Sequence, residues 1–138
     1  PWGLEGEIAV PCATQNELDE DDAKALVANN VQAVAEGANM PSTNGAKQVF
    51  KEAKVLFAPG KAANAGGVAV SGLEISQNRQ RQSRKREVID LELRRIMSHL
   101  HAQCVADGER DGFVDYSRGA DVAGFRRVAD AMIAQGRG

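Results

Sequence analysis

The chain has 138 residues, 43% of them hydrophobic and 26% charged, which is the composition of one globular domain and excludes a disordered chain. Seventeen Lys and Arg against nineteen Asp and Glu give a formal charge of -2, which argues against a nucleic-acid partner. No apolar run approaches the about 20 residues of a membrane-spanning helix, so we expect no membrane partner and a cytoplasmic location. Cys12 and Cys104 have no CxxC partner, and we expect two free thiols.

The first half of the chain predicts alternating strands and helices. Short apolar runs at 7–12, 31–36 and 54–58 have the length and composition of buried strands. Apolar residues at helical spacing follow over 19–30, over 41–53 with Ser42 or Thr43 as the cap, and then up to Asn78. This alternation predicts an α/β fold in which helices cover a parallel sheet.

The composition changes after Asn78. Residues 79–86 include no apolar side chain, and such a basic run is more often a solvated helix end than a phosphate site. Apolar residues then recur at three-to-four spacing over 89–104 and again over 122–133, with a polar, glycine-containing stretch between them. We therefore expect the last part of the chain, 79–138, to be helical.

Ligands of open parallel sheets bind beyond the carboxyl ends of the strands. The segments that follow the three predicted strands, 12–16, 37–41 and 59–67, are rich in amides or glycine and uncharged apart from Lys61. Asn39 and Asn64 offer both a donor and an acceptor, which suits a neutral, amide-bearing ligand. His101 and Cys104 share a helix face, but a third and fourth ligand are missing, so we expect no metal site.

Gly66 and Gly67 stand where the third helix should begin. Two helical glycines cost about 2 kcal/mol relative to alanine, so a close approach must compensate for them. The approaching group is either a ligand or the sheet on which the helix packs. Ser71, one turn further on, is by pattern alone a solvent-facing serine.

Five motifs resemble the family of NADP-specific glutamate dehydrogenases. They are PCATQNEL at 11–18, AEGANMP at 35–41, PGKAANAGGV at 59–68, SGLEISQN at 71–78 and GADVAGF at 119–125. The likeness is to the C-terminal third of the enzyme. It implies that 1–78 is the later half of a Rossmann-like coenzyme domain and that 79–138 returns to the substrate domain. Ile75 for the usual Met, Asp121-Val122 for Asn-Ile, and Arg84 near a common Trp depart from the family pattern.

The resemblance implies the reversible oxidative deamination of L-glutamate to 2-oxoglutarate and ammonia, with NADP as the cofactor. Asn39 and Asn64 match family residues near the nicotinamide and its ribose. Ser71 matches the serine that hydrogen-bonds the side-chain carboxylate of the substrate, and Val68 matches a residue that shapes this pocket.

The family's catalytic lysine and aspartate and its glycine-rich coenzyme turn lie upstream of Pro1. We therefore expect no catalytic residue in this segment, no activity from the segment alone, a missing N-terminal substrate domain, and a full-length homo-oligomer, a hexamer. Two other hypotheses stay open. The chain could be a stand-alone truncated homologue that acts as a non-catalytic binding module, or part of another amino-acid dehydrogenase of the same superfamily.

Overall fold

A three-stranded parallel sheet organises the N-terminal part of the molecule. The computed structural model describes residues 1–137, so Gly138, the end of the predicted helical segment, lies outside the described residues. Strands β1 (Ile8–Ala9), β2 (Ala33–Ala35) and β3 (Leu56–Ala58) lie in the order β1-β2-β3, with Ala33 paired to Ile8 on one side and to Leu56 on the other. The predicted α/β fold and parallel sheet are confirmed.

Each connection between these strands contains one helix, which begins at a side-chain cap. In α1 (Glu20–Ala28), the Asp19 carboxylate accepts hydrogen bonds from two backbone amides of the first turn, and the Asp22 carboxylate accepts one from the Asp19 amide at 3.2 Å. In α2 (Asn44–Glu52), the hydroxyl of Thr43 accepts from the Ala46 amide at 3.3 Å. Thr43, and not Ser42, is therefore the cap of the second helix.

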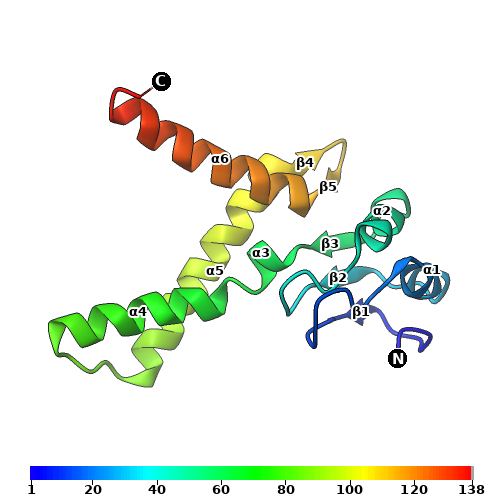
Figure 1. Cartoon of the computed structure of the whole chain (residues 1–138), viewed down its shortest axis with the longest axis horizontal. Coiled ribbons are helices and arrows are strands. Elements are labelled where there is room, and N and C mark those ends of the chain that lie inside the picture. Colours follow the sequence, from blue (N-terminus) through cyan, green and yellow to red (C-terminus); the bar gives the residue numbers. More distant parts are fainter. Residues whose placement is uncertain (138) are drawn as a thin grey trace.

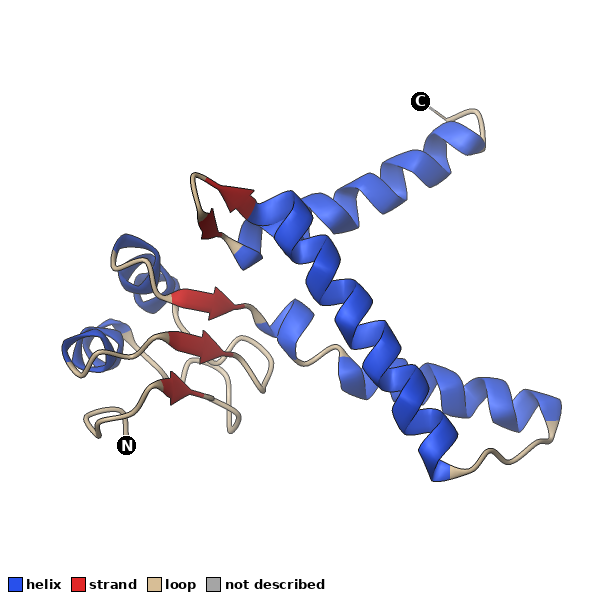
Figure 2. Cartoon of the chain, turned by 180° about the vertical axis from the view of Figure 1, so that it is seen from behind, coloured by secondary structure: helices blue, strands red, loops and turns tan. Residues whose placement is uncertain are grey.

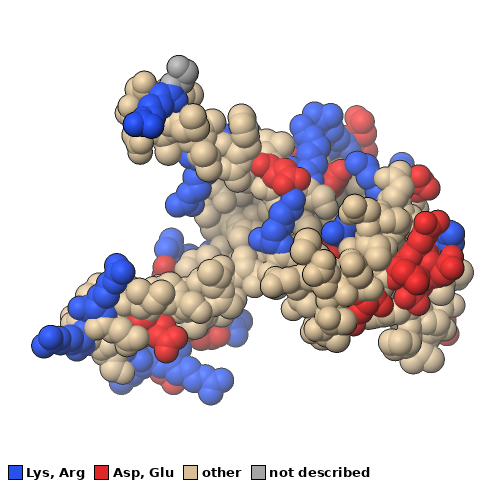
Figure 3. Space-filling view, in the orientation of Figure 1, with Lys and Arg blue, Asp and Glu red and all other residues tan. Residues whose placement is uncertain are grey.

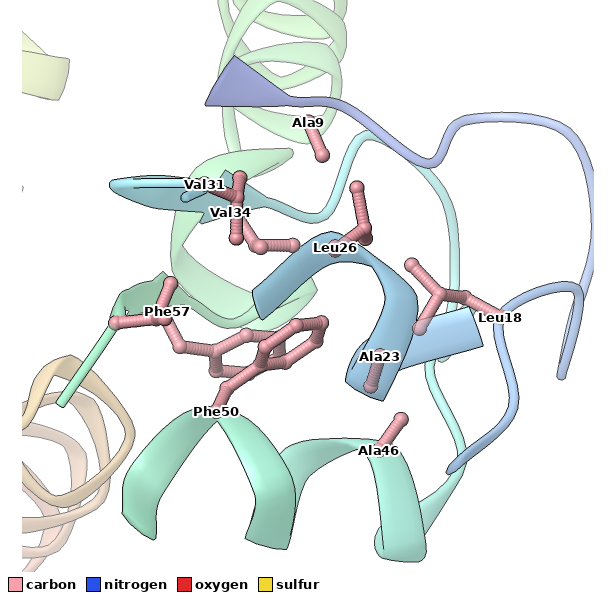
Figure 4. Packing of buried hydrophobic residues seen from close by; sticks show 10 residues of the cluster. Ala9, Leu18, Ala23, Leu26, Val31, Val34, Ala46, Phe50 and Phe57 are labelled. Carbon is pink, nitrogen blue, oxygen red and sulfur yellow. The ribbon is translucent and has the colours of Figure 1, made fainter. Parts of the chain in front are cut away.

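The hydrophobic core lies between the sheet and the α1–α2 pair (Figure 4). Phe50 of α2 is fully buried and stacks on Phe57 of β3 with ring centroids 5.8 Å apart. Small and branched side chains fill the rest of this layer: Ala9, Leu18, Ala23, Leu26, Val31, Val34, Ala46 and Val55. Burial of one sheet face on one helix layer fixes the register of the strands.

Helices make up most of the remaining chain. A short helix, α3 (Gly60–Ala63), follows β3, and then come α4 (Gly66–Gln80), α5 (Arg86–Gly108) and α6 (Tyr116–Ala134). The predicted last helix begins six residues earlier than the 122–133 pattern indicated, because the Asp115 side chain caps it at the Arg118 amide. The polar stretch before it contains a small antiparallel hairpin, β4 (Glu109–Arg110) and β5 (Phe113–Val114), which we did not predict.

Helices α5 and α6 cross with their backbones in contact. A Cβ atom added at Gly119 would overlap the carbonyl oxygen of Cys104, and one added at Gly108 would overlap that of Asp115. Only glycine fits at these two positions, so the crossing is fixed by the sequence. Helix α5 lies on the side of the sheet opposite α1 and α2, and a cavity of about 270 Å³ separates it from Ala35 and Ala58. The beginning of α6 instead reaches α2, where Asp115 pairs with Lys51.

Much of the helical part exposes apolar or basic side chains. On α6, Phe125 is 75% and Ile133 67% exposed, an amount of apolar surface typical of an interaction face. Figure 3 shows basic side chains around the α4–α5 turn, far from the acidic side chains around α1. Within residues 1–137, no helix combines the length and the apolar character needed to cross a bilayer.

Candidate functional site

The three segments that follow the strands meet at one edge of the sheet. All three strands point toward α3 and the α4–α5 pair (Figure 2), so their carboxyl ends lie on the same side. A cavity of about 780 Å³ opens there. Its lining comes from the loops after β1 and β2, the C-cap of α3, and α4: Ala13, Thr14, Gln15, Gly37, Ala38, Asn39, Asn64 and Val68. The predicted convergence of the strand ends is confirmed.

Asn39 and Asn64 lie side by side in this cavity. The Nδ2 amide of Asn64 donates to the carbonyl oxygen of Ala38 at 2.9 Å and to Oδ1 of Asn39 at 3.5 Å. The carbonyl partner fixes which end of the Asn64 amide is the nitrogen. Within residues 1–137 the Nδ2 of Asn39 and the Oδ1 of Asn64 have no hydrogen-bond partner. The pair thus presents one free donor and one free acceptor.

The cavity suits a neutral amide-bearing ligand. None of its lining side chains carries a charge, and the Thr, Gln and Asn groups offer donors and acceptors beside apolar surface. These residues fit the carboxamide and ribose hydroxyls of a nicotinamide nucleotide. They do not include the glycine-rich turn that a pyrophosphate requires.

Val68 and Ser71 follow on α4. Val68 is 74% exposed and lines the cavity, so the structure places it beside Asn39 and Asn64. Ser71 is exposed one turn further along α4 and does not line the cavity. In residues 1–137, Gly67 has no atom within 4 Å of an added Cβ, and Gly66 faces Leu93 and Met97 of α5. Packing of α4 on the sheet therefore does not explain the two glycines.

The sequence prediction missed a buried carboxylate beneath the two asparagines. Glu36 is 2% exposed, and its oxygens accept hydrogen bonds from the amides of Gly60 at 2.7 Å and Ser42 at 3.3 Å. The ammonium of Lys47 lies 3.7 Å away. One signal was available: Glu36 follows Val34 by two residues, so strand alternation places both on the buried face.

Cys104 is buried and Asp115 is half-buried, and both have displaced pKa values. Burial, and next the nearby Asp107, raise the pKa of the Cys104 thiol, whereas Cys12 is exposed on the loop after β1. Burial also opposes ionisation of Asp115, but hydrogen bonds from the Arg118 amide and the Lys51 ammonium outweigh it and lower the pKa of this carboxyl. Both cysteines are free, as expected. The Nε2 atom of His101 lies 3.1 Å from the hydroxyl oxygen of Tyr116.

Sequence comparison shows to which protein family the chain is similar. The sequence profile of the Glutamate/Leucine/Phenylalanine/Valine dehydrogenase family matches residues 1–136. The NAD(P)-specific glutamate dehydrogenase of Xylanibacter ruminicola is 58% identical over 137 residues, which cover 99% of this chain and 31% of the relative. The NADP-specific enzyme of Escherichia coli is 58% identical over 136 residues, covering 99% and 30%. The NAD-specific enzyme of Bacteroides fragilis is 53% identical over 137 residues, covering 99% and 31%.

Solved structures agree with the sequence comparison. A glutamate dehydrogenase from Plasmodium falciparum superposes with a TM-score of 0.92 at 46% identity, covering 98% of this chain and 29% of that one. A hetero-hexameric glutamate dehydrogenase from Thermus thermophilus gives a TM-score of 0.87 at 25% identity, covering 97% and 31%. The chain thus spans about 30% of the length of the curated relatives it matches. With the fold, the convergent strand ends and the sequence motifs in agreement, the chain belongs to the Glutamate/Leucine/Phenylalanine/Valine dehydrogenase family.

Proposed function

We propose that this chain is the C-terminal part of an NADP-dependent glutamate dehydrogenase. The reaction is the reversible oxidative deamination of L-glutamate to 2-oxoglutarate and ammonia. The observation that carries the proposal is the Asn39–Asn64 pair in an uncharged cavity at the strand ends, in a chain 58% identical to glutamate dehydrogenases. In this assignment, 1–78 is the later half of the coenzyme domain, and 79–138 connects back to the substrate domain.

The residues of this chain would bind and orient the nicotinamide end of the coenzyme. The free Nδ2 of Asn39 and the free Oδ1 of Asn64 match the carbonyl and amino groups of a carboxamide. The coenzyme, when bound, supplies the hydride chemistry. Val68 would form the wall of the pocket on the α4 side. Ser71, one helical turn after Val68, would donate a hydrogen bond from its hydroxyl to the side-chain carboxylate of the substrate.

The acid–base groups belong to the rest of the enzyme in this proposal. We expect no dehydrogenase activity from the chain by itself, because it contributes no catalytic lysine or aspartate. Assembly with the missing substrate domain, a homohexameric state and a cytoplasmic location are further parts of the proposal. The curated relatives include NADP-, NAD- and NAD(P)-specific enzymes, so NADP rests on the motif resemblance.

A chimera tests the function directly. In it, this chain replaces the matching segment of the Escherichia coli enzyme, which is 58% identical to it. We expect glutamate-dependent reduction of NADP by the chimera and none by the purified chain. Asn64→Ala should raise the KM for the coenzyme, and Ser71→Ala should raise the KM for glutamate, each by roughly tenfold or more for a lost hydrogen bond to the ligand. A folded but inactive chimera would refute the proposal.

The exposed apolar face of α6 favours a second candidate, a non-catalytic binding module that associates with intact subunits. Phe125, Val128 and Met132 are 49–75% exposed on this face. For this candidate, the purified chain should co-elute with the intact Escherichia coli enzyme in size-exclusion chromatography. Separate elution together with an active chimera would leave only the enzyme assignment.

A further inference from the structure

Glu36 is an unusual residue for the end of a buried strand. A carboxylate removed from water needs compensation, and an ion pair with the Lys47 ammonium, 3.7 Å from Oε1, supplies part of it. Two backbone amides supply direct hydrogen bonds. Oε2 accepts from the Gly60 amide at 2.7 Å, and Oε1 accepts from the Ser42 amide at 3.3 Å.

The two amides belong to the two segments that carry the asparagines. Ser42 ends the loop after β2, which contains Asn39, and Gly60 begins α3, whose C-cap is Asn64. Asn64 then donates back to the Ala38 carbonyl at 2.9 Å. The hydrogen bonds of Glu36 and Asn64 therefore close a ring that joins the end of β2, its following loop and α3.

The ring is tightly packed around Gly60. A Cβ at this position would lie 2.7 Å from the Ala38 carbonyl oxygen and 3.3 Å from both Glu36 Oε2 and Asn64 Nδ2. Only glycine therefore fits between the two segments at this position. Loss of either oxygen of Glu36 as an acceptor would let them separate.

We propose that Glu36 is a positioning residue of the coenzyme site, which sets the separation of the Asn39 and Asn64 amides through the backbone amides of Ser42 and Gly60. This inference rests on the proposed function. A carboxylate is required because both of its oxygens accept, whereas glutamine at this position turns an NH2 group toward one of the two backbone N–H donors. Side-chain volume alone would be equally well provided by glutamine.

The test compares Glu36→Gln with Val34→Ala in the Escherichia coli chimera described above. Val34 is buried on the same strand face and contacts the core, so its truncation lowers stability without touching the ring. We expect Glu36→Gln to raise the KM and the fluorescence-titrated Kd for NADPH by about tenfold, with less than twofold change in the KM for 2-oxoglutarate. Val34→Ala should lower Tm and leave both coenzyme constants unchanged.

A double-mutant cycle with Asn64→Ala identifies the route of the effect. If Glu36 acts through Asn64, adding Glu36→Gln to Asn64→Ala raises the Kd for NADPH by less than threefold instead of a further tenfold. Multiplicative effects in this cycle would overturn the proposal, and so would coenzyme constants in Glu36→Gln that match those of Val34→Ala. A chimera without substitutions that neither binds NADPH nor turns over would refute the proposed function, and this inference with it.

Discussion

Substitution of Gly60 by alanine measures how closely the loop after β2 and α3 must approach. The new Cβ would lie 2.7 Å from the carbonyl oxygen of Ala38, a backbone atom that no rotamer change can move. Relief to about 3.2 Å requires a displacement of roughly 0.5 Å, which strains the 2.9 Å hydrogen bond from Asn64 to the same oxygen.

The free-energy cost follows from these contacts. Overpacking of this size costs about 1–3 kcal/mol, and weakening the Asn64 hydrogen bond adds about 1 kcal/mol. The lower chain entropy of unfolded alanine offsets about 0.4–1 kcal/mol. We therefore expect Gly60→Ala to destabilise the protein by about 1–3 kcal/mol.

Thermal unfolding and NADPH titration of the chimera are the assays. We expect a lower Tm together with a weaker coenzyme affinity, because the same displacement moves Asn64. An unchanged Tm and an unchanged Kd for NADPH would show that the two segments do not touch as described. A lower Tm with unchanged affinity would separate the packing of Gly60 from the coenzyme site.

Three further predictions concern other parts of the chain. Gly67→Ala should raise the stability of α4 by up to about 1 kcal/mol, since its added Cβ meets no atom within 4 Å, and a lower Tm would contradict this. Iodoacetamide should alkylate exposed Cys12 in the folded protein and Cys104 only after unfolding, because burial raises the pKa of Cys104; mass spectrometry of the peptides distinguishes the order. The lowered pKa of Asp115 means that its stabilising effect is present above the ordinary Asp pKa of about 3.9 and is lost as pH falls through the folded value. Asp115→Asn, which retains a helix cap, should therefore be less stable than the parent protein at pH 7, and urea titrations should show this difference shrinking as the pH falls through the folded pKa of Asp115.

The sheet and its helices could be predicted because the sequence repeats one local pattern three times. Each apolar run ends near Pro or Gly, and the first two helices start with a capping residue, Asp19 and Thr43. The strands themselves are short, since pairing is confined to residues such as 33–35. Local pattern therefore identified which segments are strands better than where each strand ends.

The β4–β5 hairpin had a signal that the prediction did not use. Asp111 and Gly112 form its turn with φ values of 52° and 76°, and Asp-Gly is a preferred pair for a two-residue hairpin turn. Its strands have only two residues each, so no alternation of apolar and polar residues was visible. The Asp-Gly pair was therefore the one sequence feature that could have predicted this hairpin.

The asparagines were predicted as a site, whereas Glu36 was not, and the reason is physical. Asn39 and Asn64 follow strands, and the geometry of a parallel sheet alone brings such positions to one edge. The burial of Glu36 depends on an amide 24 residues away, at Gly60, which becomes its partner only when α3 packs beside the loop after β2. This partner is not visible in the local sequence, although the alternation with Val34 could have indicated that the Glu36 side chain is buried.

The glycine crossing of α5 and α6 has a mechanical consequence. The backbones touch at Gly108 and Gly119, and the side-chain contacts His101–Tyr116 and Asp107–Arg126 join the helices beside the crossing, so we expect α5 and α6 to move as one unit. Two ion pairs join this unit to neighbouring helices, Lys51–Asp115 to α2 and Lys61–Asp121 to α3, and a cavity lies between α5 and the sheet. Of the two, only Lys61–Asp121 has both side chains largely exposed, and such a pair contributes at most about 1 kcal/mol and weakens as salt screens it. Higher ionic strength should therefore loosen the attachment of the helical arm at α3 first, while the α5–α6 crossing itself stays intact.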